Sequence, residues 1–149
     1  MVSLDRKYLL VMMEAGYVYL GMQRFEEATK VFEGIAALAP DSEVPIVALG
    51  GVSFCKGDFK DSIRHYKKAL KIDPDSLFAK VYLGEALFFS GEKEKAMNFL
   101  QEVLKADHDG AAGNFAKALL EAIDHGFTPG MILEKEGKQA HAKAQTQVH

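Results

Sequence analysis

The chain has 149 residues, of which 48% are hydrophobic and 26% are charged, and its formal net charge at pH 7 is -3. This composition is typical of one folded domain or a short repeat array and excludes a disordered chain. The slightly acidic balance argues against nucleic acid as a partner, and the single cysteine, Cys55, excludes an internal disulfide. No apolar run approaches the roughly 20 residues of a membrane span, so we expect a cytoplasmic protein without membrane insertion.

The sequence repeats every 34 residues, over residues 9–42, 43–76 and 77–110, which align without a gap. Three columns of the alignment are a glycine, a small residue and a large apolar residue: Gly16, Gly50 and Gly84; Ala28, Ser62 and Ala96; Phe32, Tyr66 and Leu100. The small residues indicate positions where two helices approach closely, because a larger side chain would push their backbones apart.

Within each repeat, the apolar residues follow the three- and four-residue spacing of an amphipathic helix. In the second repeat this spacing runs from Ile46 to Ser53, breaks at Gly57, and resumes from Phe59 to Leu70. Each repeat is therefore predicted to be a helical hairpin.

One further helix is predicted after the third repeat, at about residues 111–125, with Gly126 as its end. It should cap the last repeat, whose apolar side would otherwise be exposed. We expect residues 1–126 to form a single domain and residues 127–149 to form a turn and a flexible tail, since residues 134–149 have almost nothing to bury.

Two stretches carry a family resemblance. GDFKDSIRHYKKALKIDPDS (57–76) and LGEALFFSGEKEKAMNFLQEVLKAD (83–107) are similar to tetratricopeptide repeats. The first repeat diverges, with Ala15-Gly16 where the family usually has Leu-Gly and Gln23 where it usually has glycine. The resemblance implies an all-α fold, a right-handed α-solenoid of three helical hairpins followed by a capping helix. It says little about function, because the family is a scaffold that binds many unrelated partners.

In that family the first helix of each hairpin lines a concave groove, so the resemblance also assigns a partner groove. Its side chains here would be Leu10, Met13, Tyr17, Leu20, Val44, Val47, Phe54, Phe78, Val81, Glu85, Phe88 and Phe89. Only Glu85 is charged, and Gly21 and Gly51 leave room for a ligand, so the groove suits an apolar or amphipathic helix. The alternative is that these apolar side chains are simply core. The adjacent rings of Phe88 and Phe89 are expected to turn toward the groove, while Leu83 and Leu87 pack inside the hairpin.

A second interface is predicted on the outer side of the first helix. Leu4, Val11 and Val18 occupy positions that in the family normally pack against a preceding hairpin, and we expect no such hairpin before residue 9. A terminal repeat should present a polar face, so this stripe predicts a small helical co-chaperone or a homodimer. Residues 1–8 folding back could cover part of it.

Catalysis and cofactor binding are not predicted. The five histidines and Cys55 lack metal-ligand spacing, and the sequence has neither a phosphate-binding glycine loop nor a nucleophile elbow. The basic run at residues 64–71 is flanked by aspartates, which favours a solvated face over nucleic-acid binding.

Size, repeat number and surface chemistry together resemble the chaperones of bacterial type III secretion. Our first hypothesis is a chaperone of the needle subunit, which would hold the amphipathic helix of that self-assembling protein in the groove. The alternatives are a class II chaperone of translocator proteins and a generic repeat scaffold in another complex. We do not expect a co-chaperone of Hsp70 or Hsp90. Proteins of that kind resemble one another in a clamp of lysine, asparagine and basic residues that binds two carboxylates, and here its positions are occupied by Met13, Tyr17, Ala48, Phe78 and Tyr82.

Overall fold

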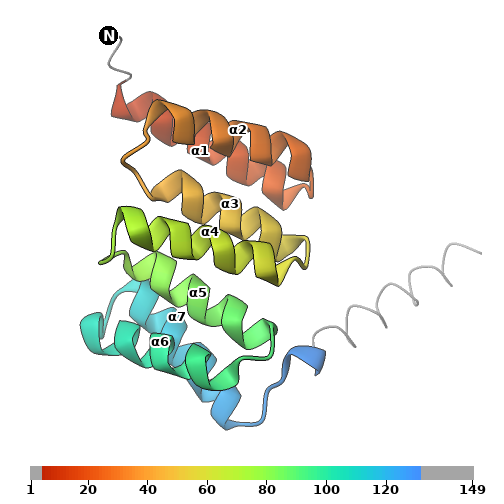
Figure 1. Ribbon diagram of the computed structural model, residues 1–149, viewed down its shortest axis with the longest axis vertical. Coiled ribbons are helices and arrows are strands. Elements are labelled where there is room, and N and C mark those ends of the chain that lie inside the picture. Colours follow the sequence, from red (N-terminus) through yellow and green to blue (C-terminus); the bar gives the residue numbers. More distant parts are fainter. Residues whose placement is uncertain (1–4, 132–149) are drawn as a thin grey trace, which may run out of the picture.

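The computed structural model describes residues 5–131, which contain seven α-helices, a further helical turn at residues 129–131 and no strand (Figure 1). The helices are α1 (Arg6–Gly21), α2 (Phe25–Leu38), α3 (Val44–Cys55), α4 (Phe59–Ile72), α5 (Leu77–Phe89), α6 (Lys93–Ala106) and α7 (Ala111–Asp124). They confirm the predicted all-α class, with three hairpins and a final helix. Leu4 and the predicted tail beyond residue 131 lie outside the described residues, so the division into domain and tail stays a prediction. None of the described helices has the length and apolar content needed to cross a membrane.

Small residues let the two helices of each hairpin come into close contact. A Cβ atom at Gly50 would lie 2.4 Å from the Tyr66 ring, and one at Gly84 would lie 3.0 Å from the Leu100 side chain. Ser62, fully buried, donates a hydrogen bond of 2.9 Å to the Gly50 carbonyl. The glycine and large-residue columns of the repeat are therefore the two halves of one packing contact.

The turns inside the hairpins need a left-handed backbone. Gly57 and Gly91 have φ of 80° and 95°, which glycine adopts without a steric penalty. In the first hairpin this role falls to Gln23, with φ of 60°, so a non-glycine residue is held where a Cβ atom is unfavourable. The divergence of the first repeat does not change its fold.

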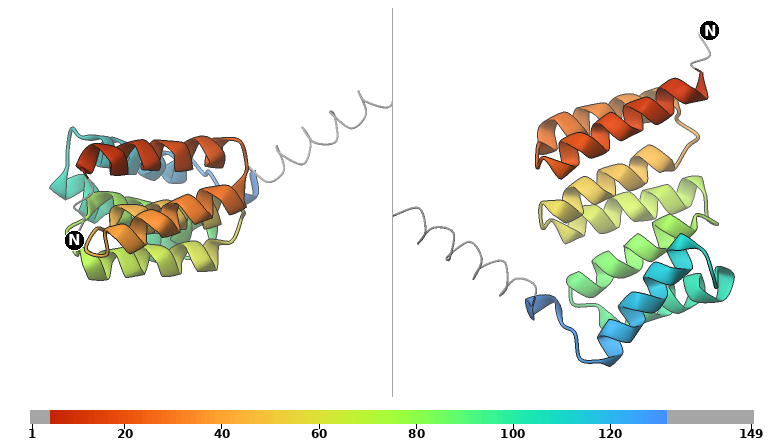
Figure 2. Two further views of the ribbon diagram at one scale, coloured as in Figure 1. Left: turned by 90° about the horizontal axis from the view of Figure 1, so that it is seen from above. Right: turned by 180° about the vertical axis from the view of Figure 1, so that it is seen from behind.

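The final helix turns onto the inner side of the array. We call the side formed by α1, α3 and α5 the groove face. Figure 2 (right) shows α7 on the same side as α1, where it contacts both α5 and α6. Phe115 of α7 lies edge-on to Tyr82 of α5, with ring centroids 5.9 Å apart, and Phe127 stacks on Phe88 at 5.9 Å. The groove face is therefore closed at its C-terminal end and open over α1, α3 and the start of α5.

Candidate functional site

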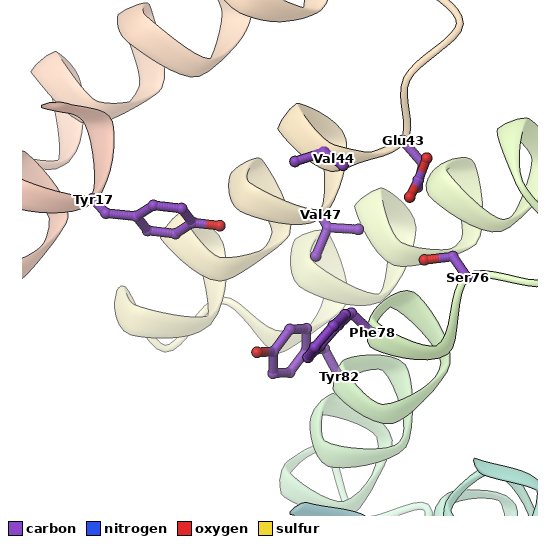
Figure 3. Close-up of a pocket in the computed structure, with 7 residues that line it drawn as sticks. All are labelled: Tyr17, Glu43, Val44, Val47, Ser76, Phe78 and Tyr82. Atoms are coloured by element: carbon purple, nitrogen blue, oxygen red, sulfur yellow. The ribbon is translucent and has the colours of Figure 1, made fainter. Parts of the chain in front are cut away.

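A cavity of about 260 Å³ opens on the groove face between α1, α3 and α5. Figure 3 shows the Tyr17 ring projecting from α1 toward α3, with the rings of Phe78 and Tyr82 on the opposite side. Tyr17 and Phe78 are each 49% exposed, and the Phe78 and Tyr82 rings stack with centroids 6.0 Å apart. Four predicted groove residues line this cavity: Tyr17, Val44, Val47 and Phe78.

A second cavity of about 190 Å³ lies next to the first, with Val44 lining both. It adds the predicted residues Leu10, which is 58% exposed, and Met13, which is buried. The end of α2 and Arg6 complete its wall. Leu20 is half-buried against the core and lines neither cavity.

The assignment of Val81 and Phe88 to an open groove is wrong. Val81 is 0% exposed and Phe88 is 3% exposed, so both belong to the core. Phe88 is covered by the Phe127 ring, which comes from the chain beyond α7. Leu83 and Leu87 are buried as expected.

Phe89 and Phe54 belong to an aromatic cluster rather than to an open groove, which corrects a second expectation. The Phe89 ring contacts Phe54 and Phe59 at centroid distances of 5.3 and 5.6 Å, and Phe54 contacts Phe59 at 5.2 Å. Phe88 and Phe127 join the cluster through Phe89, at 5.8 and 6.5 Å. Phe89 is therefore partly covered by this chain's own rings and does not project freely from an open groove.

Glu85 is half-buried one turn beyond Tyr82 on α5. Burial raises the pKa of its carboxyl from 4.5 to about 7. Its charge also contributes, after burial, to raising the pKa values of Cys55 on α3 and Tyr82. No ion pair or hydrogen bond of its side chain is found within residues 5–131. Glu85 is thus an acidic group in an apolar surface, without a compensating cation from the described chain.

Tyr82, Glu43 and Ser76 line the first cavity and were missed by the sequence analysis. Tyr82 could have been found, because it follows Phe78 by four residues and so shares its helix face. Glu43 and Ser76 precede α3 and α5, and the groove positions implied by the family resemblance lie within the helices.

The outer face of α1 is apolar and exposed. Val11 and Val18 are each 62% exposed, and the structure extends the predicted stripe to Tyr8 and Met22, at 64% and 58%. These residues follow one another at three-, seven- and four-residue steps, which keeps them on one helix face. Residues 6–8 belong to α1 itself, so they do not fold back over the stripe.

A serine, an aspartate and a histidine meet between α3 and α4, but not in a catalytic order. Ser53 donates a 2.6 Å hydrogen bond to Asp61 Oδ2, and His65 Nε2 lies 3.3 Å from the same oxygen. The hydrogen bonds from Ser53 and Arg64 hold the pKa of Asp61 at about 2. Ser53 donates to the Asp61 carboxylate and not to the imidazole, and a carboxylate with a pKa of about 2 is too weak a base to activate a serine as a nucleophile. The hydrogen bond instead links α3 and α4. Within residues 5–131, no group of His, Cys, Asp or Glu side chains is arranged to hold a metal ion.

Comparison with known proteins agrees with this geometry. The family model described as "Tetratricopeptide repeat" matches residues 56–123. The chain has a tetratricopeptide-repeat fold. A search of curated protein sequences finds no match.

Three solved structures illustrate the range of proteins with this fold. The type III secretion translocator chaperone SycD of Yersinia enterocolitica is 18% identical, with a TM-score of 0.70 over 79% of this chain and 91% of SycD. PcrH of Pseudomonas aeruginosa is 17% identical, with a TM-score of 0.70 over 82% and 96%. The first repeat domain of Spaghetti (RPAP3), bound to the HSP90 peptide SRMEEVD, is 19% identical, with a TM-score of 0.66 over 83% and 99%. SycD has also been solved with a peptide of the translocator YopD, and PcrH with the chaperone-binding regions of PopB and PopD.

Proposed function

We propose that this protein is a peptide-binding chaperone of the type III translocator class, acting in the cytoplasm by binding rather than catalysis. It would hold an apolar segment of a secreted client on the groove face until export. A segment buried in this way is unavailable for self-assembly, because binding to the chaperone competes with every other contact of the same apolar surface.

The observation that carries this proposal is the first cavity. Its volume of about 260 Å³ exceeds the roughly 150 Å³ of an engineered apolar cavity that binds benzene, so it can receive an aromatic or aliphatic side chain. Tyr17 and Phe78 leave about half of their surface exposed beside it, although aromatic side chains gain free energy when they are buried. A cavity of this kind is a ready binding site for an apolar anchor of a peptide.

The translocator class is favoured over the needle-subunit class that we first expected. SycD is described as a translocator chaperone, and PcrH has been solved with the chaperone-binding region of PopD. The match to this chain covers more than nine-tenths of the length of each. The open groove is also shorter than the needle-helix hypothesis requires, since Val81 and Phe88 are buried and Phe89 is partly covered by neighbouring rings. A site limited to α1, α3 and the part of α5 up to the half-buried Glu85 suits a short segment with one or two apolar anchors.

Phe78→Glu is expected to abolish peptide binding, because it places a charge at the cavity mouth while altering a side chain that is half exposed. The probe is a phage-displayed library of random dodecapeptides, selected on the intact protein. The enriched peptides are synthesised with a fluorophore and titrated by fluorescence anisotropy. We expect loss of affinity by at least about tenfold, with an unchanged far-UV circular dichroism spectrum.

Leu38→Glu is the matched control, since Leu38 of α2 is 51% exposed and lines neither cavity. It should leave peptide affinity unchanged. Equal affinity of the wild-type protein and Phe78→Glu, or a library without any enriched peptide, would contradict the proposal. Phe88 is unsuitable for this test, because a charge at a side chain that is 3% exposed would disrupt the core.

The α1 stripe supports a second contact, with a homodimer or a small helical partner. The paired substitution Val11→Asp and Val18→Asp is expected to convert a dimer to a monomer, because it places two charges on the exposed apolar face. Multi-angle light scattering at several protein concentrations measures this. A Glu14→Asp variant, altering an exposed acidic residue of the same helix, should keep the wild-type mass. An unchanged mass in the double variant would show that the stripe does not mediate self-association.

A further inference from the structure

The groove face carries acidic groups without basic ones around the first cavity. Glu43 lines this cavity, and Glu85 lies three residues beyond Tyr82 on the same side of α5. Among the described residues, no lysine or arginine lines the first cavity, and Arg6 lines the second. A ligand held here meets carboxylates and aromatic rings, with no fixed positive charge from the cavity wall.

The surroundings of Glu85 leave room for a ligand group. Cys55 of α3, whose thiol is influenced by the Glu85 charge, is exposed. Gly51, one turn before Cys55, is half-exposed and has no atom within 4 Å of the position that a Cβ would occupy. The titratable groups near Glu85 are Cys55 of α3, Tyr66 of α4 and Tyr82, whose pKa values are all raised, first by burial and then by the Glu85 charge. All three are neutral at pH 7, so none of them supplies a counter-charge.

We propose that the groove selects apolar client segments that present one lysine or arginine to Glu85, beside a large apolar side chain in the first cavity. This inference rests on the proposed peptide-binding function and specifies its substrate class. A cation from the client would supply the partner that Glu85 lacks, and a hydrogen-bonded pair of this kind contributes more in a partly buried site than on an open surface.

The spacing of the two anchors follows from α5. Phe78 and Glu85 are seven residues apart, which corresponds to about 10 Å along a helix. A client segment would therefore place its basic side chain about 10 Å from its apolar one. In an extended segment this distance corresponds to a separation of about three residues. Acidic segments, such as the SRMEEVD peptide of the Spaghetti complex, would be rejected by repulsion from Glu85 and Glu43.

The experiment selects the same dodecapeptide phage library on the wild-type protein, on Glu85→Gln and on Glu85→Lys. We expect wild-type peptides to carry a basic residue at a fixed distance from a leucine, phenylalanine or other large apolar residue. In an enriched peptide, replacing that lysine by leucine should weaken binding to the wild-type protein about tenfold and to Glu85→Gln less than twofold. Glu85→Lys should enrich acidic residues instead.

The pH dependence gives a second readout. Because the pKa of Glu85 is raised, affinity for the lysine peptide should increase from pH 6 to pH 8, whereas affinity for its leucine analogue should not increase. A basic preference that persists in Glu85→Gln, or wild-type peptides that are apolar without a basic position, would overturn the inference and leave peptide binding intact. A library with no enriched peptide on any variant would instead overturn the proposed function, and this inference with it.

Discussion

Gly113→Ala is expected to destabilise the protein by about 3 kcal/mol and to displace α7. A Cβ at Gly113 would lie 1.5 Å from the Asp107 carbonyl oxygen, a backbone atom that cannot move without shifting the connection between α6 and α7. The same connection is held by the Asp107 carboxylate, which accepts hydrogen bonds from the backbone N–H groups of Gly110 and Gly113 at 2.8 and 3.0 Å. Relief of this clash must move the backbone of residue 113 away from Asp107, which also weakens the hydrogen bond that caps the helix.

Urea unfolding followed by circular dichroism measures the change in the free energy of unfolding. The control is Gly51→Ala, also within a helix but with open space around the new Cβ, and it should raise stability by roughly 0.5–1 kcal/mol. Gly113→Ala should also increase the binding of a hydrophobic dye, because a displaced α7 uncovers Tyr82. Equal stability of the two variants would mean that α7 does not depend on this contact.

The pairing of helices could be predicted from the sequence because it is a repeated contact. Gly50 and Tyr66 recur as a pair in the other hairpins, so a column of the alignment reports a physical neighbour. Phe78 and Val44 could be assigned to the groove for the same reason, since the family resemblance fixes the side of the helix on which each position lies.

The covered part of the groove could not be predicted in this way, because its cover comes from outside the repeats. Phe127 and α7 have no counterpart in the earlier hairpins, so no alignment column indicates that they reach Phe88. The predicted positions of the Phe54 and Phe89 rings in the groove were wrong for a related reason. Each lies in the last turn of its helix, where the ring can reach Phe59 at the start of α4 instead of the open face.

Glu85→Gln is expected to stabilise the free protein at pH 8 and to have little effect at pH 4. Burial raises the pKa of Glu85 in the folded protein from 4.5 to about 7, so the folded state holds a proton that the unfolded chain has lost over this range. Stability therefore falls as the pH rises from about 4.5 to about 7, which is opposite to the effect of an ion-paired carboxylate. Each pH unit between the two pKa values is worth about 1.4 kcal/mol, so the gain at pH 8 has an upper limit of about 3.5 kcal/mol.

Urea titrations of both proteins at pH 4, 6 and 8 give this difference, with Glu33→Gln as the control because Glu33 is an exposed glutamate of α2. The stability of the wild-type protein, measured relative to Glu85→Gln, should decrease as the pH rises. If it does not decrease, burial does not destabilise the charged Glu85 carboxylate. The same variant should weaken the binding of lysine-containing peptides, so stability and affinity change in opposite directions. That opposition is expected of a charge kept for recognition, since a residue that only supported the fold would lower stability when it was replaced.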